Sequence, residues 1–336
     1  MIGAGSWGTA LAVSLSLGGH DVRLWARRSE AAAAMREERC NKVYLPEVNI
    51  PESILITDSL EEAVRDTTCW LIAVPSQGVR AVAEQMRMWQ SSSLLVVSVA
   101  KGIENGTLMT SSEVLLDVFR ELHPTQVAVL YGPSHAEEVG RGAPTTVVAS
   151  SKCPKTAARV QDVFMTPTLR VYVNTDLKGV EIAGSVKNVL AIAAGISDGV
   201  GYGDNAKAAI LTRGLSEIKR LGVALGAQEG TFGGLAGIGD MVVTCMSTLS
   251  RNRNLGYAVG KGKSLEEVQS EMSMVAEGVR TTQSVMELAR SLNVEMPITA
   301  AVHSILFDRV PPEEAVRKLM MRSAKQEEWI VSDPTC

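Results

Sequence analysis

Hydrophobic and polar positions change their spacing along the first half of the chain. Short runs rich in β-branched and aromatic residues alternate there with stretches in which apolar residues recur at helical spacing. The runs predict strands at residues 21–25, 69–74, 93–99, 126–130, 145–149 and 169–173, and the helical spacing predicts helices at 79–88 and 111–122. Alternating strands and helices are typical of a mostly parallel sheet with right-handed crossovers.

Beyond residue 174 the strand pattern fades. Long stretches rich in alanine, leucine, isoleucine and glycine follow, and they predict helices at residues 176–196, 205–225, 279–292 and 311–320. The chain has 336 residues, which is longer than a single hydrophobic core usually grows. We therefore predict two domains, an α/β domain at residues 1–174 and an all-α domain at residues 175–336.

Composition narrows the class of protein. A hydrophobic fraction of 46% with 21% charged residues indicates a globular protein, and the net charge of −4 gives no basic excess for nucleic acid. Five cysteines and four histidines show no metal-ligand spacing, which predicts no metal site and free thiols in a reducing cytoplasm. No apolar run approaches the roughly 20 residues that span a bilayer, and no signal peptide precedes the first turn. We expect a soluble cytoplasmic protein without membrane insertion.

A glycine-rich turn opens the chain. Gly3, Gly5 and Gly8 fit the G-x-G-x-x-G pattern, with a helical stretch and the predicted strand 21–25 behind them at the distance of a βαβ unit. The first glycine permits the tight turn, the second lets the backbone approach a pyrophosphate, and the third allows close packing of helix on sheet. A plain glycine-rich turn is the alternative. The pattern favours a Rossmann-type, doubly wound dinucleotide-binding domain whose first strand is short, because only Met1 and Ile2 precede the turn.

The second predicted strand ends at Arg27 and Arg28, where an NAD-specific domain usually presents an acidic residue to the ribose 2′-hydroxyl. Guanidinium groups suit a 2′-phosphate, so we expect NADP to be accepted as well as NAD, and the preference between them stays open. The alternative is that both arginines are ordinary solvated surface residues.

Two lysines occupy positions of chemical interest. Lys101 follows the predicted strand 93–99, at the sheet edge that faces the cofactor in this fold, although a lone lysine there can also be a solvated loop charge. Lys187 lies within the apolar helical run 182–191, so it either extends to the surface or lines a cavity. A cavity beside Lys101 would lower the pKa of Lys187 and suit it to general acid/base catalysis.

Polar residues elsewhere offer candidate anion ligands. Ser134 follows the predicted strand 126–130, and we expect it to cap the next helix. Residues 237–241 and 250–254 are expected in or beside loops. Arg251 could hold a phosphate in bidentate fashion and Asn252 could add a donor, with an ordinary polar connector as the alternative.

The order of these segments resembles that of the bacterial-type NAD(P)-dependent glycerol-3-phosphate dehydrogenases, from residue 2 to about residue 322. The resemblance is carried by Gly3–Gly8, Lys101-Gly102, Gly132-Pro133-Ser134-His135-Ala136, Gly184-Ser185-Val186-Lys187-Asn188, Ser197-Asp198-Gly199, Gly203-Asp204-Asn205, Gly237-Ile238-Gly239-Asp240 and Ser250-Arg251-Asn252. It implies interconversion of dihydroxyacetone phosphate and sn-glycerol 3-phosphate, a homodimer, and supply of glycerol phosphate to phospholipid synthesis.

The resemblance also implies a role for individual residues. Lys187 matches the catalytic proton donor and acceptor. Positions around the triose phosphate are matched by Lys101, Gly132, Ser134, Lys187, Asp240, Ser250, Arg251 and Asn252. Cofactor contacts beyond the turn glycines are matched by Ser6, Trp7, Arg27, Arg28, Tyr44, Lys101, Ala136, Arg251, Val275 and Glu277.

We therefore expect Lys187 to protonate the developing alkoxide, Lys101 to stabilise its charge, and Asp240 to orient Lys187. Arg251 and Asn252 would anchor the substrate phosphate. Two other functions stay open: a related hydroxyacid or ketopantoate-type reductase, in which Arg251 would hold a carboxylate, and a non-catalytic dinucleotide sensor. Retention of both lysines argues against the sensor, which needs no acid/base pair.

Overall fold

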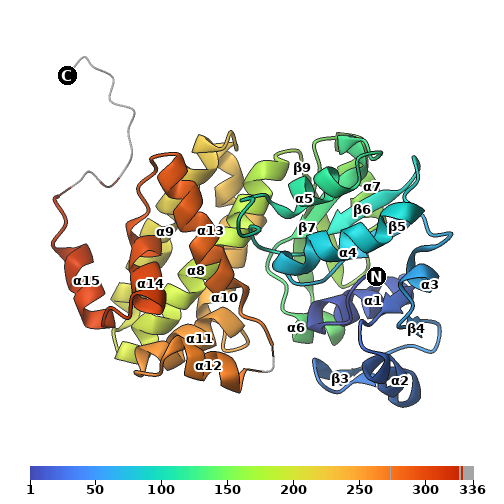
Figure 1. Ribbon diagram of the computed structural model, residues 1–336, viewed down its shortest axis with the longest axis horizontal. Coiled ribbons are helices and arrows are strands. Elements are labelled where there is room, and N and C mark those ends of the chain that lie inside the picture. Colours follow the sequence, from blue (N-terminus) through green and yellow to red (C-terminus); the bar gives the residue numbers. More distant parts are fainter. Residues whose placement is uncertain (273, 325–326, 328–336) are drawn as a thin grey trace.

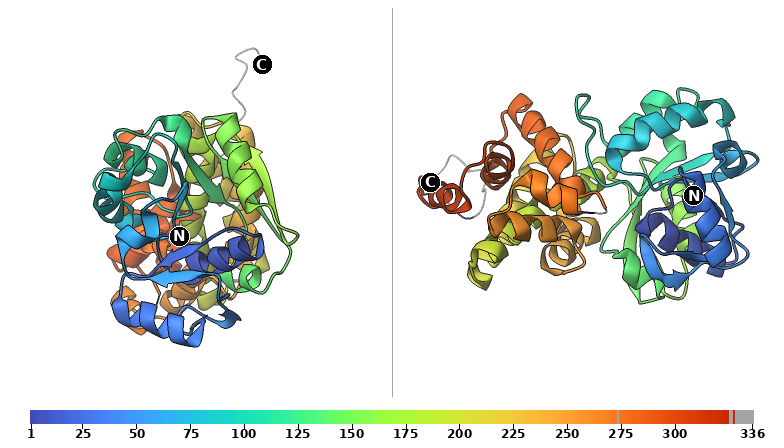
Figure 2. Two further views of the ribbon diagram at one scale, coloured as in Figure 1. Left: turned by 90° about the vertical axis from the view of Figure 1, so that its right-hand side faces the viewer. Right: turned by 60° about the horizontal axis from the view of Figure 1, so that its bottom comes forward.

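The computed structural model describes residues 1–272, 274–324 and 327. Figures 1 and 2 show two halves side by side along the long axis, one built on a sheet and one made of helices. The strands are β1 (Arg23–Trp25), β2 (Cys40–Asn41), β3 (Leu45–Asn49), β4 (Leu55–Thr57), β5 (Cys69–Ile72), β6 (Leu95–Ser98), β7 (Val127–Tyr131), β8 (Thr145–Ser150) and β9 (Leu169–Asn174).

The helices of the first half connect these strands. They are α1 (Ser6–Leu17), α2 (Ser29–Glu38), α3 (Leu60–Val64), α4 (Val79–Met86), α5 (Ser111–Val118), α6 (Ala136–Gly140) and α7 (Pro154–Phe164), with 3-10 turns η1 (Ser76–Gly78), η2 (Arg87–Trp89) and η3 (Pro124–Gln126). All six predicted strands are present. The short strands β2, β3 and β4 were not predicted.

The main sheet has the strand order β5-β6-β7-β8-β9, and β1 pairs with β4 beside it. Neighbouring strands are parallel except β7 and β8, which are antiparallel, so the prediction of a mostly parallel sheet is confirmed. A single residue replaces the first strand: Ile2 bridges in parallel to both Trp25 and Ile72. Its N–H donates to Leu71 and its carbonyl accepts from Ala73, both at 2.8 Å.

Helices cover both faces of the sheet. Side chains alternate between faces along a strand, so Val97 of β6 lies in the core beneath α1 and α7, whereas Val96 lies in the core beneath α4 and α5. This burial on both faces explains the continuous apolar runs of the central strands.

The helical half surrounds α8 (Leu177–Val200), which begins where Asp176 accepts a hydrogen bond from Gly179 and ends at Gly201 in the left-handed conformation. The other helices are α9 (Asp204–Ala224), α10 (Asp240–Met246), α11 (Arg251–Gly260), α12 (Leu265–Glu271), α13 (Glu277–Ser291), α14 (Pro297–Phe307) and α15 (Pro312–Met320), with a 3-10 turn η4 (Glu229–Gly233) and a π-helical turn η5 (Leu235–Gly239).

Helix α8 corrects one expectation. We expected no apolar run of membrane-spanning length, but α8 is long and apolar enough to cross a membrane by length and composition alone, with a mean hydropathy of 1.3. Its most apolar 18-residue window is entirely buried by the surrounding protein. This burial is typical of the core helix of a large domain, which is hydrophobic on all sides.

Candidate active site

A buried carboxylate joins two ammonium groups between the halves. Asp240 Oδ1 accepts from Lys187 Nζ at 2.5 Å, and Asp240 Oδ2 accepts from Lys101 Nζ at 2.8 Å. Lys187 also donates to Thr244 Oγ1 at 2.6 Å, and Lys101 donates to the Gly132 carbonyl at 2.9 Å. The structure thus brings together Lys101, Gly132, Lys187 and Asp240, four predicted site residues that lie far apart in the chain.

Each of these side chains has a fixed support. Lys187 extends from the middle of α8, and Asp240 is the first residue of α10. Lys101 follows β6 at its carboxyl end, which is the edge where ligands bind in open parallel sheets. Its ammonium group lies 5.7 Å from the ring centroid of Tyr131, whose hydroxyl donates to the Ala100 carbonyl.

Burial determines the charges in this cluster. The side chain of Lys187 is only 6% exposed, so it does not extend to the surface. Desolvation, with the Lys101 charge in support and Asp240 in opposition, lowers the pKa of Lys187 to about 8. Burial alone would raise the pKa of Asp240, but the two ammonium groups hold it below its ordinary value. The carboxylate is therefore ionised between two cations.

The loop after β7 contributes backbone and imidazole groups. Gly132 has φ +137°, and an added Cβ would lie 3.0 Å from the Cα of Val147, so this position requires glycine. The prediction that Ser134 caps α6 was wrong: His135 is the N-cap residue, and Ser134 donates instead to the Gly132 carbonyl at 2.9 Å. His135 Nε2 is buried and has no hydrogen-bond partner among the described residues.

Helix α11 begins beside the same cluster. We expected residues 250–254 in or beside a loop, and they begin directly after one: Ser250 is an N-cap that accepts from the Arg253 N–H, and Arg251 and Asn252 form the first turn of α11. The exposed Arg251 side chain donates to the Val275 carbonyl at 3.2 Å. Helix α11 starts at this point because the Ser250 hydroxyl accepts from an N–H group that has no partner within the helix.

Asn252 is buried and takes part in a chain of amide contacts. Its Nδ2 donates to Asn188 Oδ1 at 3.1 Å, and its Oδ1 accepts from the Gly278 N–H at 2.9 Å. Asn188 Nδ2 in turn donates to the Lys101 carbonyl at 3.4 Å. The first turn of α11 is thereby linked through α8 to the residue that bears one of the two ammonium groups.

The glycine turn fits a dinucleotide pyrophosphate. Gly3 has φ +114°, and an added Cβ would lie 2.8 Å from the Ala73 carbonyl, whereas a Cβ on Gly8 would lie 1.9 Å from the Gly3 carbonyl. Around Gly5 an added Cβ meets nothing within 4 Å, which leaves the turn open to an anion. Helix α1 has no side-chain cap and no acidic residue in its first turn, so its N–H groups face that space.

The other predicted cofactor residues lie on several elements. Arg27 and Arg28 follow β1 and are exposed, and Ser6 and Trp7 begin α1, with Trp7 Nε1 buried and without a partner among the described residues. Tyr44 lies half-buried between β2 and β3. The remaining predicted contacts are Ala136 at the start of α6, the exposed Val275, and the half-buried Glu277.

Glu277 spans the two halves. It begins α13, and its carboxylate accepts from the Ser76 N–H at 3.1 Å and from the Ser76 hydroxyl. Burial raises the pKa of Glu277 against these hydrogen bonds.

Sequence reasoning missed several residues of this region. Thr244 could have been found, because it follows Asp240 by one helical turn, and Asn188 directly follows Lys187. Tyr131 and His135 carried no signal by themselves, since an apolar strand residue and a lone histidine are ordinary in a core.

Comparisons with known proteins agree with this geometry. Models of the N-terminus and the C-terminus of NAD-dependent glycerol-3-phosphate dehydrogenase match residues 1–157 and 176–317. A Salinibacter ruber protein named glycerol-3-phosphate dehydrogenase (NAD(P)+) 2 is 59% identical over 330 residues, 98% of this chain and 96% of that protein. A similarly named protein of Pelodictyon phaeoclathratiforme is 57% identical over 327 residues, 97% of this chain and 98% of its own.

A solved structure is similar as well. The crystal structure of glycerol-3-phosphate dehydrogenase from Coxiella burnetii superposes with a TM-score of 0.91 at 39% identity, covering 96% of this chain and 98% of its own. With both family models matched in order over most of the chain, this protein belongs to the NAD-dependent glycerol-3-phosphate dehydrogenase family, and it is an oxidoreductase that uses NAD or NADP.

Proposed function

We propose that this chain interconverts dihydroxyacetone phosphate and sn-glycerol 3-phosphate, with Lys187 as the group that donates and accepts the proton. The observation that carries the proposal is the buried Lys187–Asp240–Lys101 cluster at the carboxyl end of β6. Two ammonium groups share one carboxylate, so the cluster keeps a net positive charge when both lysines are protonated. That local charge suits an anionic substrate although the whole chain is acidic.

The glycine turn would hold NADH or NADPH, which would supply the hydride for reduction of the C2 carbonyl. Lys187 Nζ transfers a proton to the carbonyl oxygen as it gains negative charge, and the oxygen becomes the C2 hydroxyl. The Lys101 ammonium group stabilises the same charge electrostatically. Asp240 fixes both ammonium groups and limits how far burial lowers the pKa of Lys187. In the oxidation direction, neutral Lys187 accepts the hydroxyl proton.

The substrate phosphate is assigned to the start of α11. Arg251 carries an exposed guanidinium group there, and Ser250 and Asn252 lie beside it at the helix N-terminus. A dianion at this end interacts with the helix dipole and with unpaired N–H groups. Gly132 and Ser134 offer further contacts through the loop after β7.

The two alternative functions gain no support from the comparisons. A non-catalytic sensor has no use for a buried lysine with a lowered pKa beside a second lysine. A reductase of hydroxyacids requires a carboxylate site, whereas the matched family models are those of a glycerol-3-phosphate dehydrogenase.

The test follows the oxidation of NADPH with dihydroxyacetone phosphate and, separately, with unphosphorylated dihydroxyacetone. We expect turnover with the phosphorylated ketone alone. Lys187→Ala should lose about 10³-fold or more in kcat with nearly unchanged NADPH binding, because only the proton transfer is removed. Arg251→Ala should raise KM for dihydroxyacetone phosphate at least tenfold. Near-normal turnover by Lys187→Ala would exclude this mechanism.

We also propose the wider setting of this activity. The dinucleotide-binding domain comprises residues 1–174 and the substrate and dimerisation domain residues 175–336, with β9 ending at Asn174 and α8 beginning at Leu177. The protein acts as a homodimer in the cytoplasm and feeds glycerophospholipid synthesis. The resemblance to the family is the support for these assignments.

A further inference from the structure

The segment from Lys101 to Thr110 links β6 to α5, and we name it the 101–110 connector. It begins with the ammonium group that reaches Asp240, and it enters the helical half at Ile103, which is fully buried among residues of α8 and α13. The connector has little regular structure of its own, and Gly106 and Leu108 both have positive φ. An antiparallel bridge between Ile103 and Thr110 closes the connector on itself, and contacts from other elements fix it against the rest of the protein.

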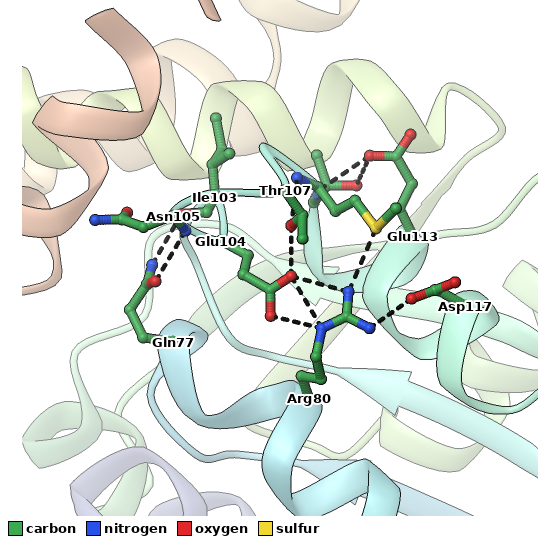
Figure 3. A network of polar contacts seen from close by, with 10 residues as sticks. Gln77, Arg80, Ile103, Glu104, Asn105, Thr107, Glu113 and Asp117 are labelled. Atoms are coloured by element: carbon green, nitrogen blue, oxygen red, sulfur yellow. Dashed lines mark hydrogen bonds and ion pairs between the residues drawn. The ribbon is translucent and has the colours of Figure 1, made fainter. Parts of the chain in front are cut away.

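One face of the connector is held by a single guanidinium group (Figure 3). Arg80 of α4 donates from Nε to Glu104 Oε1 at 3.0 Å and from Nη2 to Glu104 Oε2 at 2.9 Å. Its Nη1 donates to Asp117 of α5 at 2.5 Å. Glu104 also accepts from the Thr107 hydroxyl within the connector. Arg80 thus joins α4, the connector and α5 at one point.

Other contacts bind the connector to α13 of the helical half and to η1. Ser284 of α13 donates to the Ile103 carbonyl at 2.9 Å, and Asn105 Nδ2 donates to Gln283 Oε1 at 3.2 Å. Gln77 of η1 donates to the Ile103 carbonyl at 2.8 Å and accepts from the Asn105 N–H at 3.0 Å. Since η1 leads directly into α4, the segment 76–80 reaches the connector from two sides.

These contacts differ from ordinary surface ion pairs in their burial. The side chains of Glu104 and Arg80 are 11% and 25% exposed, and the pair is bidentate. Loss of the guanidinium would leave a largely desolvated carboxylate without its cation, three residues after Lys101. The connector would then have to move to rehydrate Glu104.

From these contacts we propose that Arg80 is a positioning residue for the reaction, which sets Lys101 against Asp240 and Lys187 by clamping Glu104. It touches neither substrate nor cofactor and acts through the connector. The inference depends on the proposed function, because it assumes that Lys101 and Lys187 carry the chemistry. A geometric displacement on the order of 1 Å at such a group is enough to cost up to about 100-fold in rate.

The consequence for Lys187 has a definite sign. Asp240, Lys101, Cys245 and His135 are the charged or titratable groups that act on it in the described part of the chain. The Lys101 charge lowers the pKa of Lys187, and Lys101 shares the Asp240 carboxylate with it. If Lys101 moves away, Lys187 loses a nearby positive charge and no longer shares the Asp240 carboxylate. Each of these two effects raises the pKa of Lys187.

The experiment measures kcat/KM for dihydroxyacetone phosphate reduction against pH in Arg80→Ala, Arg80→Lys and the exposed control Arg65→Ala. We expect a loss of roughly 10- to 100-fold in Arg80→Ala, with the alkaline limb displaced to higher pH. Arg80→Lys should recover part of the rate, since lysine keeps the positive charge but cannot form the bidentate pair with Glu104. Arg65→Ala should match the parent protein.

Repeating the Arg80→Ala substitution in a Lys101→Ala protein distinguishes an effect of Arg80 on the position of Lys101 from a general loss of stability. If Arg80 acts through Lys101, adding Arg80→Ala to Lys101→Ala displaces the alkaline limb no further. An unmoved limb in Arg80→Ala, or an equal displacement in both backgrounds, overturns the inference. If Arg80→Ala does not fold, the same pH profiles are measured for Glu104→Gln and Arg80→Lys. An alkaline limb that stays in place in both variants overturns the inference. Activity retained by Lys187→Ala would instead overturn the proposed function.

Discussion

Asp240 is the residue on which the proposed site depends. Its carboxylate is 1% exposed and accepts from two ammonium groups, and such a buried charge is stable only because both partners are in place. The pair of lysines is placed by this one carboxylate rather than by direct contact with each other. A change at Asp240 would therefore alter the positions of the Lys187 and Lys101 ammonium groups together.

The reaction should follow the charge of Lys187. Reduction requires its protonated form, so kcat/KM for dihydroxyacetone phosphate should fall as pH rises through about 8, while oxidation of glycerol 3-phosphate should rise over the same range. Asp240 raises the pKa of Lys187, so Asp240→Asn should move both limbs to lower pH. Profiles of rate against pH measure this displacement, with substitution of the exposed Asp21 (Asp21→Asn) as control. Limbs that stay in place in Asp240→Asn would contradict the assignment.

Arg27 and Arg28 make a second prediction at single positions. Both side chains are exposed and have no ion-pair partner in the described part of the chain, so they are free to meet a 2′-phosphate. The double variant Arg27→Ala/Arg28→Ala should raise KM for NADPH about tenfold and leave KM for NADH nearly unchanged. Steady-state kinetics with both cofactors measure it, with Arg65→Ala as control. A strong preference of the parent protein for NADH would refute it.

Helices α8 and α11 lie unusually close because each carries two glycines four residues apart. An added Cβ on Gly195 would lie 2.0 Å from the Arg253 carbonyl, and one on Gly256 would lie 2.2 Å from the Ile192 carbonyl. Gly199 and Gly260 repeat this contact one turn later. The close approach sets α11, which bears Arg251, against α8, which bears Lys187.

A methyl group in this contact should therefore affect both stability and substrate binding. Gly256→Ala meets backbone that cannot move independently, so we expect a loss of about 1–3 kcal/mol or more in the free energy of unfolding. A raised KM for dihydroxyacetone phosphate should accompany it, because Arg251 moves with α11. The control is Gly230→Ala, where an added Cβ meets nothing within 4 Å. Denaturant unfolding and steady-state kinetics measure the two effects, and equal stability of both variants would refute the argument.

Across the whole molecule, three glutamates hold the starts of helices on neighbouring elements; Glu181 and Glu217 are buried and Glu277 is half-buried. Glu181 of α8 accepts from the Ser112 N–H in α5, Glu277 accepts from the Ser76 N–H in η1, and Glu217 of α9 accepts from the Ile298 N–H in α14. The first two contacts cross between the halves. Burial raises the pKa of each carboxyl, so their ionisation opposes folding while their hydrogen bonds support it.

This arrangement predicts how overall stability varies with pH. Burial raises the pKa of Glu217 to about 7, so the folded state binds its proton more tightly than the unfolded chain does. This contribution to the free energy of unfolding, on the order of 3 kcal/mol, is fully present below the ordinary glutamate pKa and is lost as pH rises through about 7. Glu217→Gln should flatten this dependence in denaturant unfolding between pH 4.5 and 8. The exposed Glu313→Gln is the control, and an unchanged slope in Glu217→Gln would contradict the prediction.

Local pattern was sufficient for much of the fold. The glycine turn depends on φ values and close contacts within a few residues, and the buried strands depend on runs of apolar residues, so both could be predicted. Strands β2, β3 and β4 have at most five residues and mixed burial, which leaves little periodicity to detect. The prediction that Ser134 is a helix cap was wrong, because the capping residue is defined by where the helix begins and a shift of one residue changes it.

The sequence by itself determined the two classes of domain, the dinucleotide turn, and Lys101 and Lys187 as candidates. The resemblance to the family suggested that Asp240 orients Lys187, but only the tertiary structure showed that its carboxylate also binds Lys101, which is 139 residues away in the chain. The tertiary structure also decided that Lys187 is buried rather than solvated, and that Arg80 clamps the connector through Glu104. Contacts of that range leave no periodic trace, because propensity and spacing report only on neighbours within one helix or strand. Long-range contacts arise when packed elements bring their ends together.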